Sequence, residues 1–145
     1  MADQQTVPTA NLVPVTDEAR AAIGGRPDVR VTELPFKVGR ESRMGRFEKL
    51  KEEVERRLGG FAPVNHLYLT EASSHPFHIS REHFEIHHLD GQFVLLDRES
   101  ACGTGVGVSR LGSDRRERRA ILRDGDQIVV GAANSPFVFR FQVEG

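Results

Sequence analysis

The feature that most constrains the fold of this chain is a series of short segments in which apolar and polar residues alternate. A period of two places the apolar side chains on one face of a strand and the polar ones on the other. The segments recur about every ten residues, and turns such as Asp90-Gly91 separate them. They are Val29–Val31, Leu34–Val38, His66–Leu69, Phe84–Ile86, Gln92–Leu96, Ile121–Leu122, Gln127–Val130 and Phe137–Val143. This pattern predicts an all-β sandwich or barrel.

One segment follows a helical period instead. Its apolar residues recur every three or four positions, at Met44, Phe47, Leu50, Val54 and Leu58. That spacing places them on one stripe of a helix, and opposite charges lie four residues apart on the remaining faces. The pair Gly59-Gly60 is a typical stop signal. We therefore expect a helix near 43–58.

The length of 145 residues is sufficient for one domain with a sizeable core. Residues 1–17 contain few large apolar groups, so we expect them to form a flexible N-terminal tail that precedes a domain over 18–145. The only cysteine, Cys102, excludes an internal disulfide and favours a cytoplasmic location. No apolar run reaches the ~20 residues of a membrane-spanning helix. A formal charge of −1 makes nucleic acid an improbable partner.

Two short segments could together bind an anion. Gly39-Arg40 ends one predicted strand, and Ser80-Arg81-Glu82-His83 precedes another. Loops at one end of a sandwich bring such strand ends together. An arginine fork, a serine hydroxyl and backbone N–H groups form a suitable socket for a phosphate dianion.

The order of the motifs raises the specificity of this signal. After Gly39-Arg40 and Ser80-x-x-His83 come Ser100-x-x-Gly103-Thr104 and Asp124-Gly125-Asp126. In this order they resemble the forkhead-associated (FHA) domain family. The resemblance extends over about residues 18–145 and implies an FHA-like β-sandwich of about 10–11 strands, with the helix near 43–58 as an insertion. It also implies a non-catalytic module that binds phosphothreonine peptides in Ser/Thr kinase signalling.

The resemblance assigns roles to individual residues. Arg40 and Ser80 would bind the phosphate, and Arg81 would add a contact to the peptide or the phosphate. Gly39 and His83 would be structural, since Gly39 permits a turn and His83 braces the loops.

The loop over residues 102–104 departs from the family pattern. Gly103 and Thr104 would form the loop that faces the peptide backbone. Cys102 stands where the family usually has an asparagine that clamps the peptide main chain, and Gly107 replaces a second asparagine. A thiol cannot both donate and accept as an amide does. The alternative function is therefore a degenerate FHA scaffold that binds itself or a partner independently of phosphate.

Three other groups of residues give weaker indications of function. His75-x-x-His78 has the spacing of a metal pair, but we predict no metal and no cofactor. Ser80 and His83 point to different faces of one strand, so we predict no enzyme. Five arginines gather in one predicted loop, at Arg110, Arg115, Arg116, Arg118 and Arg119. This run is either a solvated loop or a surface that favours acidic residues near a phosphosite.

Overall fold

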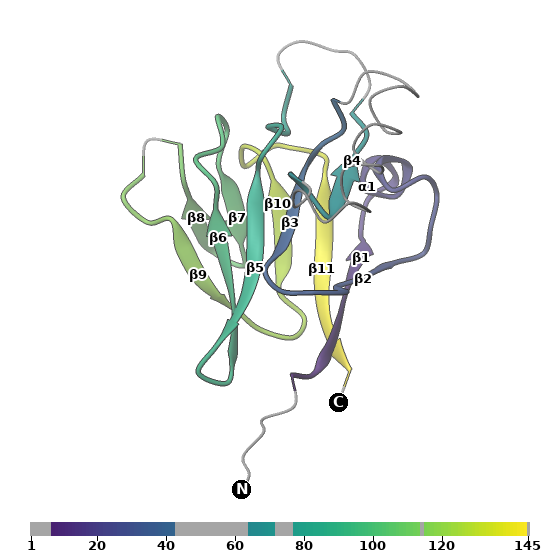
Figure 1. Ribbon diagram of the computed structural model, residues 1–145. Helices are drawn as coiled ribbons and strands as arrows, with labels where there is room; N and C mark the ends of the chain where they lie inside the picture. The colour runs from purple at the N-terminus through teal and green to yellow at the C-terminus, as the bar shows by residue number, and fades with distance from the viewer. Residues whose placement is uncertain (1–6, 43–63, 72–76, 114, 145) are drawn as a thin grey trace, which may run out of the picture.

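Two β-sheets stacked face to face form the protein (Figure 1). The computed structural model describes residues 7–42, 64–71, 77–113 and 115–144. The first sheet has the strand order β2-β1-β11-β10-β7-β8, and the second has the order β4-β3-β5-β6-β9. The strands are β1 (Thr9–Pro14), β2 (Val29–Arg30), β3 (Phe36–Arg40), β4 (Leu67–Leu69), β5 (Phe84–Leu89), β6 (Gln92–Asp97), β7 (Thr104–Val106), β8 (Ser109–Leu111), β9 (Arg119–Leu122), β10 (Gln127–Val130) and β11 (Val138–Glu144). The predicted all-β sandwich is confirmed.

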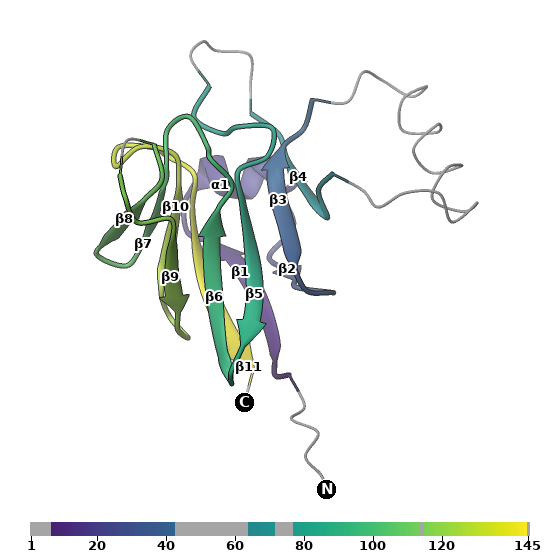
Figure 2. The same ribbon diagram turned by 60° about the vertical axis from the view of Figure 1, so that its left-hand side comes forward.

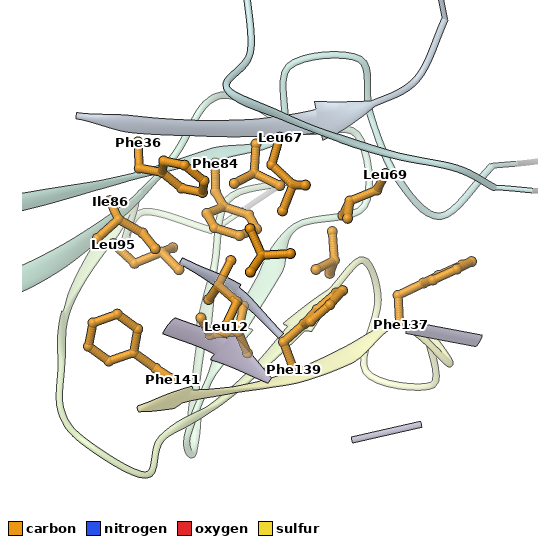
Figure 3. Close-up of a cluster of buried hydrophobic side chains, with 14 of the residues drawn as sticks. Leu12, Phe36, Leu67, Leu69, Phe84, Ile86, Leu95, Phe137, Phe139 and Phe141 are labelled. Carbon is orange, nitrogen blue, oxygen red and sulfur yellow. The ribbon is translucent and has the colours of Figure 1, made fainter. Parts of the chain in front are cut away.

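Phenylalanine side chains fill the space between the sheets. Phe36 and Phe84 point inward from the second sheet, and Phe139 and Phe141 point inward from the first (Figure 3). None of these four is more than 2% exposed. Each side chain of this size stabilises the fold by about 2–3 kcal/mol through burial. The alternation seen in the sequence is therefore the pattern of one buried face on each strand.

The hairpin of β5 and β6 follows its turn chemistry. Asp90 and Gly91 have φ angles of 51° and 79°, as a two-residue turn between twisted strands requires. Leu89 consequently pairs with Gln92, and Phe84 pairs with Asp97 at the other end of the hairpin. The turn predicted at Asp90-Gly91 is confirmed, and it joins β5 and β6 into a hairpin.

Strand β3 brings the candidate site to one end of the molecule. It pairs in parallel with β4 and antiparallel with β5, so its last residues lie beside the first residues of β5 (Figure 2). Val38 pairs with both Leu67 and Phe84. The end of β3 at Arg40 and the segment before Phe84 therefore meet at the same edge of the sandwich.

The predicted flexible tail is wrong for residues 9–17. Strand β1 pairs with β11 over six residue pairs, and Ala10 and Leu12 are each only 1% exposed. Helix α1 (Asp17–Ala22) follows directly, and the side chain of Thr16 caps it by accepting a bond from Ala19 N at 3.1 Å. The partner of β1 lies about 130 residues away in the sequence, so local composition contained no sign of this pairing.

Two further points concern helices. The helix expected near 43–58 lies outside the described residues. In the part of the chain that the structure describes, no helix is long and apolar enough to cross a membrane.

Candidate functional site

The segments that carry Arg40 and Ser80 are bonded directly to each other. The backbone N–H of Arg40 donates to the carbonyl of Ser80 at 2.9 Å. The side-chain Nε–H of Arg40 donates to the carbonyl of Ile79, also at 2.9 Å. The structure thus brings together the two residues that the sequence assigned to one anion site.

The guanidinium group of Arg40 is held in place on one side and open on the other. Its central carbon lies 4.0 Å from the centroid of the Phe77 ring, a cation–π contact. Its Nε is occupied by Ile79. Across the described ranges, no hydrogen-bond acceptor is found for its two terminal nitrogens. Those nitrogens form the bidentate edge that an oxyanion prefers.

Ser80 is oriented by two hydrogen bonds, one at its backbone N–H and one at its hydroxyl oxygen. Its N–H donates to Nδ1 of His83 at 2.9 Å. Its Oγ accepts a bond from Ala101 N at 2.9 Å, which leaves the hydroxyl hydrogen free to donate to a ligand. Ser80 is half-buried, whereas its neighbour Arg81 is exposed. Both residues can therefore be reached from solvent.

His83 is fully buried beneath this surface and links two loops. Because Nδ1 accepts from Ser80, the ring proton resides on Nε2, which donates to the carbonyl of Gly103 at 2.8 Å. Burial lowers the pKa of His83, although the Gly103 carbonyl and the charges of Asp97 and Glu71 oppose that shift. The imidazole is therefore a neutral brace and not a charge.

Gly39 allows two segments to approach closely. A Cβ atom at this position would lie 1.9 Å from the carbonyl oxygen of Arg81 and 2.7 Å from Nδ2 of Asn65. Asn65 is 2% exposed and donates to that same carbonyl at 2.7 Å. Its Oδ1 accepts from Arg98 at 2.6 Å, so one amide ties the segment before β5 to the end of β6. Sequence reasoning missed Asn65, since no spacing connects it to Arg81 or Arg98.

A buried carboxylate shapes the turn that precedes Ser80. The side chain of Glu71 is 3% exposed. It accepts the backbone N–H groups of His78 and Ile79 at 2.9–3.0 Å and also contacts the His78 ring. Glu71 thereby fixes the carbonyl of Ile79, on which Arg40 rests. The sequence offered no signal for this role, because the partners of Glu71 are backbone groups.

The side chain of Thr104 points into the fold and not towards the surface on which a peptide would lie. Thr104 is 0% exposed, and its hydroxyl donates to Oδ1 of Asp97 at 2.7 Å. The same carboxylate accepts the N–H and the hydroxyl of Ser100. Gly103 is also buried, and its N–H donates to the Ser100 hydroxyl at 3.0 Å. These residues build the loop, and the surface next to Ser80 comes from Ala101 and Cys102 instead.

Cys102 is half-buried, with its Sγ 3.7 Å from the carbonyl of Phe77. Behind it, Arg110 donates from Nη2 to the carbonyls of Cys102 and Gly131, at 3.3 and 2.7 Å. Burial, followed by the charge of Arg115, lowers the pKa of Arg110. The sequence predicted that Arg110 belongs to a loop of arginines that is either solvated or favours acidic residues, whereas Arg110 lies in β8 and is half-buried. The structure instead uses it to join the β6–β7 loop to the β10–β11 loop.

The histidines that the structure describes do not gather around a metal position. His78 is engaged by Glu71, and His83 by Ser80 and Gly103. Within the ranges given above, no group of three His, Cys, Asp or Glu side chains is arranged to hold a metal ion. His75 lies outside the described residues.

The comparison that decides the family is a match over most of the folded chain. A model of the FHA domain matches residues 37–131. The chain belongs to the FHA domain family. The match includes every strand from β4 to β10, together with Arg40, Ser80 and His83.

Solved FHA-domain structures share this fold. The chain resembles the Mycobacterium tuberculosis EmbR structure, with a TM-score of 0.58 and 21% identity. That match extends over 100% of this chain but only 27% of the EmbR chain. The N-terminal FHA domain of Saccharomyces cerevisiae Rad53 gives a TM-score of 0.55 at 16% identity, over 94% of both chains. A comparison with curated protein sequences found no match.

Proposed function

We propose that this FHA domain is a non-catalytic interaction module that binds phosphothreonine peptides at Arg40, Ser80 and Arg81. One observation carries the proposal. The open guanidinium edge of Arg40 and the free hydroxyl hydrogen of Ser80 lie at one end of the sandwich, on segments bonded to each other. The EmbR structure and the Rad53 structure each hold a phosphopeptide.

The chemistry of the site suits a dianion. Arg40 supplies a fixed positive charge with two donor nitrogens, and Ser80 supplies a neutral donor. Hydrogen bonds to a charged group contribute about 1.5–3 kcal/mol each. Arg81 is exposed beside them and adds a second charge. A phosphorylated side chain therefore gains much more from this surface than an unmodified threonine does.

A place in a Ser/Thr kinase pathway and a cytoplasmic location are part of the same proposal. They follow from the chemistry of a phosphothreonine reader and from the use of a single cysteine.

A second candidate function is a scaffold that binds independently of phosphate. The observation that favours it is Cys102, whose half-buried thiol stands in the place of a peptide-clamping amide. The two functions differ in their dependence on Arg40. A phosphopeptide reader needs its charge, whereas a scaffold does not.

The deciding experiment is a ¹⁵N-NMR titration with a degenerate phosphothreonine peptide pool and with the same pool unphosphorylated. We expect shifts at Arg40, Ser80 and Cys102 with the phosphorylated pool only. Arg40→Gln should abolish these shifts, while Arg123→Gln, at an exposed arginine in the β9–β10 turn, should not. Arg123→Gln should unfold at the wild-type temperature, and Arg40→Gln, which loses its bond to Ile79, should remain folded with a loss of stability of about 1 kcal/mol. Equal shifts with both pools, or none with either, would exclude the phosphothreonine reader.

A further inference from the structure

The connection between β8 and β9 carries a set of unpartnered positive charges. Arg115, Arg116 and Arg118 lie in this connection and Arg119 begins β9, and all four are exposed. Within the described part of the chain, none of these four guanidinium groups has a hydrogen bond or an ion pair. Other arginines behave differently, since Arg98 binds Asn65 and Glu82 and Arg110 binds two backbone carbonyls. The four arginines are therefore not used to hold the fold together.

The backbone of this connection is nevertheless fixed. Gly112 N donates to the carbonyl of Glu117 at 2.9 Å, and Arg115 N donates back to the carbonyl of Gly112 at 3.0 Å. These two bonds close a compact loop. Asp97 N then donates to the carbonyl of Arg118 at 2.7 Å, which attaches the loop to the end of β6. The arginine side chains thus project from a backbone that is held by hydrogen bonds.

The connection between β8 and β9 adjoins the proposed phosphate site. A Cβ atom on Gly103 would lie 3.7 Å from the Cβ of Ser113. The carbonyl of Gly103 accepts the bond from His83, which in turn holds Ser80. Figures 1 and 2 show the β8–β9 connection at the same end of the sandwich as the segment that leads into β5. A peptide anchored at Ser80 therefore passes close to the arginines on one of its flanks.

We propose that Arg115, Arg116 and Arg118 extend the phosphothreonine site and select peptides with acidic residues on one flank. This inference rests on the proposed function. The neighbouring groove on the outer face of the second sheet has a mixed charge, because Glu82, Glu85 and Glu99 line it together with Lys37, Arg98 and Arg118. These charges nearly cancel, so the groove itself does not attract an acidic chain. The selectivity therefore comes from the exposed arginines of the connection between β8 and β9.

The size of the effect follows from the exposure of the charges. A solvent-exposed ion pair changes affinity by up to about fivefold. Two or three pairs acting together give an acidic flank an advantage of about tenfold at low salt. Because exposed charges are screened, this advantage falls at high ionic strength. The contact with phosphate through Arg40, which is held in place by Ile79 and Phe77, is less sensitive to salt.

Three synthetic phosphothreonine peptides test the proposal by fluorescence anisotropy at low and high salt. One has alanine on both flanks, one has aspartates before the phosphothreonine, and one has aspartates after it. We expect one aspartate peptide to bind about tenfold more tightly than the alanine peptide at low salt. The double variant R115E/R116E should lose that preference and keep its affinity for the alanine peptide. The control R123E/R140E makes the same change in net charge at exposed residues elsewhere and should keep the preference.

The outcomes separate the two proposals. Binding of the alanine peptide with no preference for aspartate, or an equal loss of preference in both double variants, would overturn the arginine surface and leave the phosphothreonine reader intact. Failure of all three peptides would overturn both. A single-stranded oligonucleotide that outcompetes the aspartate peptides on the wild type, and fails to do so on R115E/R116E, would overturn the acidic-peptide assignment in favour of nucleic acid.

Discussion

Nε2 of His83 lies 2.8 Å from the carbonyl oxygen of Gly103 and joins the two loops that border the candidate site. The opposite ring nitrogen accepts the backbone N–H of Ser80. One neutral ring thus connects the residue that would touch phosphate to the loop that carries Cys102. The link works in only one protonation state, because a protonated Nδ1 cannot accept a hydrogen bond.

The first prediction is that acid destabilises the protein through His83. Burial lowers the pKa of His83 below its ordinary value of 6.5. As the pH falls, the unfolded chain therefore binds the proton before the folded chain does. The free energy of unfolding should therefore be unaffected by His83 above pH 6.5. Below pH 6.5 it should decrease by up to about 1.4 kcal/mol per pH unit.

Urea unfolding of the wild type and of His83→Gln at a series of pH values measures this effect. His83→Gln should be less stable at neutral pH, by about 1–3 kcal/mol, because it leaves a buried partner unsatisfied. The difference in the free energy of unfolding between the wild type and His83→Gln should become smaller as the pH falls. A difference that is constant with pH would show that His83 does not titrate between the folded and unfolded states.

The second prediction concerns the packing at Gly39. Gly39→Ala places a methyl group 1.9 Å from the carbonyl oxygen of Arg81, where no side chain can give way. The variant should lose about 2–4 kcal/mol of stability, since backbone must shift in a buried region. Gly91→Ala, at an exposed turn where a Cβ would meet nothing, should lose only about 1 kcal/mol. Similar losses in both variants would contradict the close approach at Gly39.

The sequence predicted those parts of the fold that depend on local periodicity and turn chemistry. The alternation in Phe84–Ile86 and Gln92–Leu96 and the turn at Asp90-Gly91 were sufficient to define the hairpin. Strand β1 and helix α1 were missed, because the stability of β1 comes from pairing with β11 at the far end of the chain. The local pattern of apolar and polar residues contains no information about a pairing strand so far away in the sequence.

The same distinction holds at the site. Motif order indicated Arg40, Ser80 and His83, and the structure brings all three together. The motif did not show that the Thr104 side chain is buried, because a motif gives position in the sequence and not the direction of the side chain. The supporting residue Glu71 was missed because it binds mainly backbone N–H groups, which any sequence provides. Asn65 was missed because no motif or spacing connects it to Arg81 and Arg98.

The third prediction is that Glu71 sustains ligand binding without touching the ligand. Glu71→Gln replaces one of the two acceptor oxygens with a donor, and in either orientation of the amide this donor faces the backbone N–H of His78. The turn before Ser80 should loosen, and phosphopeptide affinity should fall by about tenfold, equivalent to about 1.4 kcal/mol. Isothermal titration calorimetry would measure this fall. Glu18→Gln, at an exposed residue of α1, is the control and should bind normally. Unchanged affinity in Glu71→Gln would show that the turn does not need the carboxylate.

The last prediction concerns the residue that departs from the family pattern. Cys102 is half-buried beside Ala101, whose N–H holds the Ser80 hydroxyl. Cys102→Asn supplies an amide that can both donate to and accept from a peptide backbone, which a thiol cannot do. Two such bonds at a partly exposed site should strengthen phosphopeptide binding by about 1–3 kcal/mol. Cys102→Ser, which adds a single hydroxyl, should gain less. If Cys102→Asn bound no more tightly than the wild type, the peptide main chain would have to be held elsewhere, and the arginines between β8 and β9 would become the principal contact besides the phosphate.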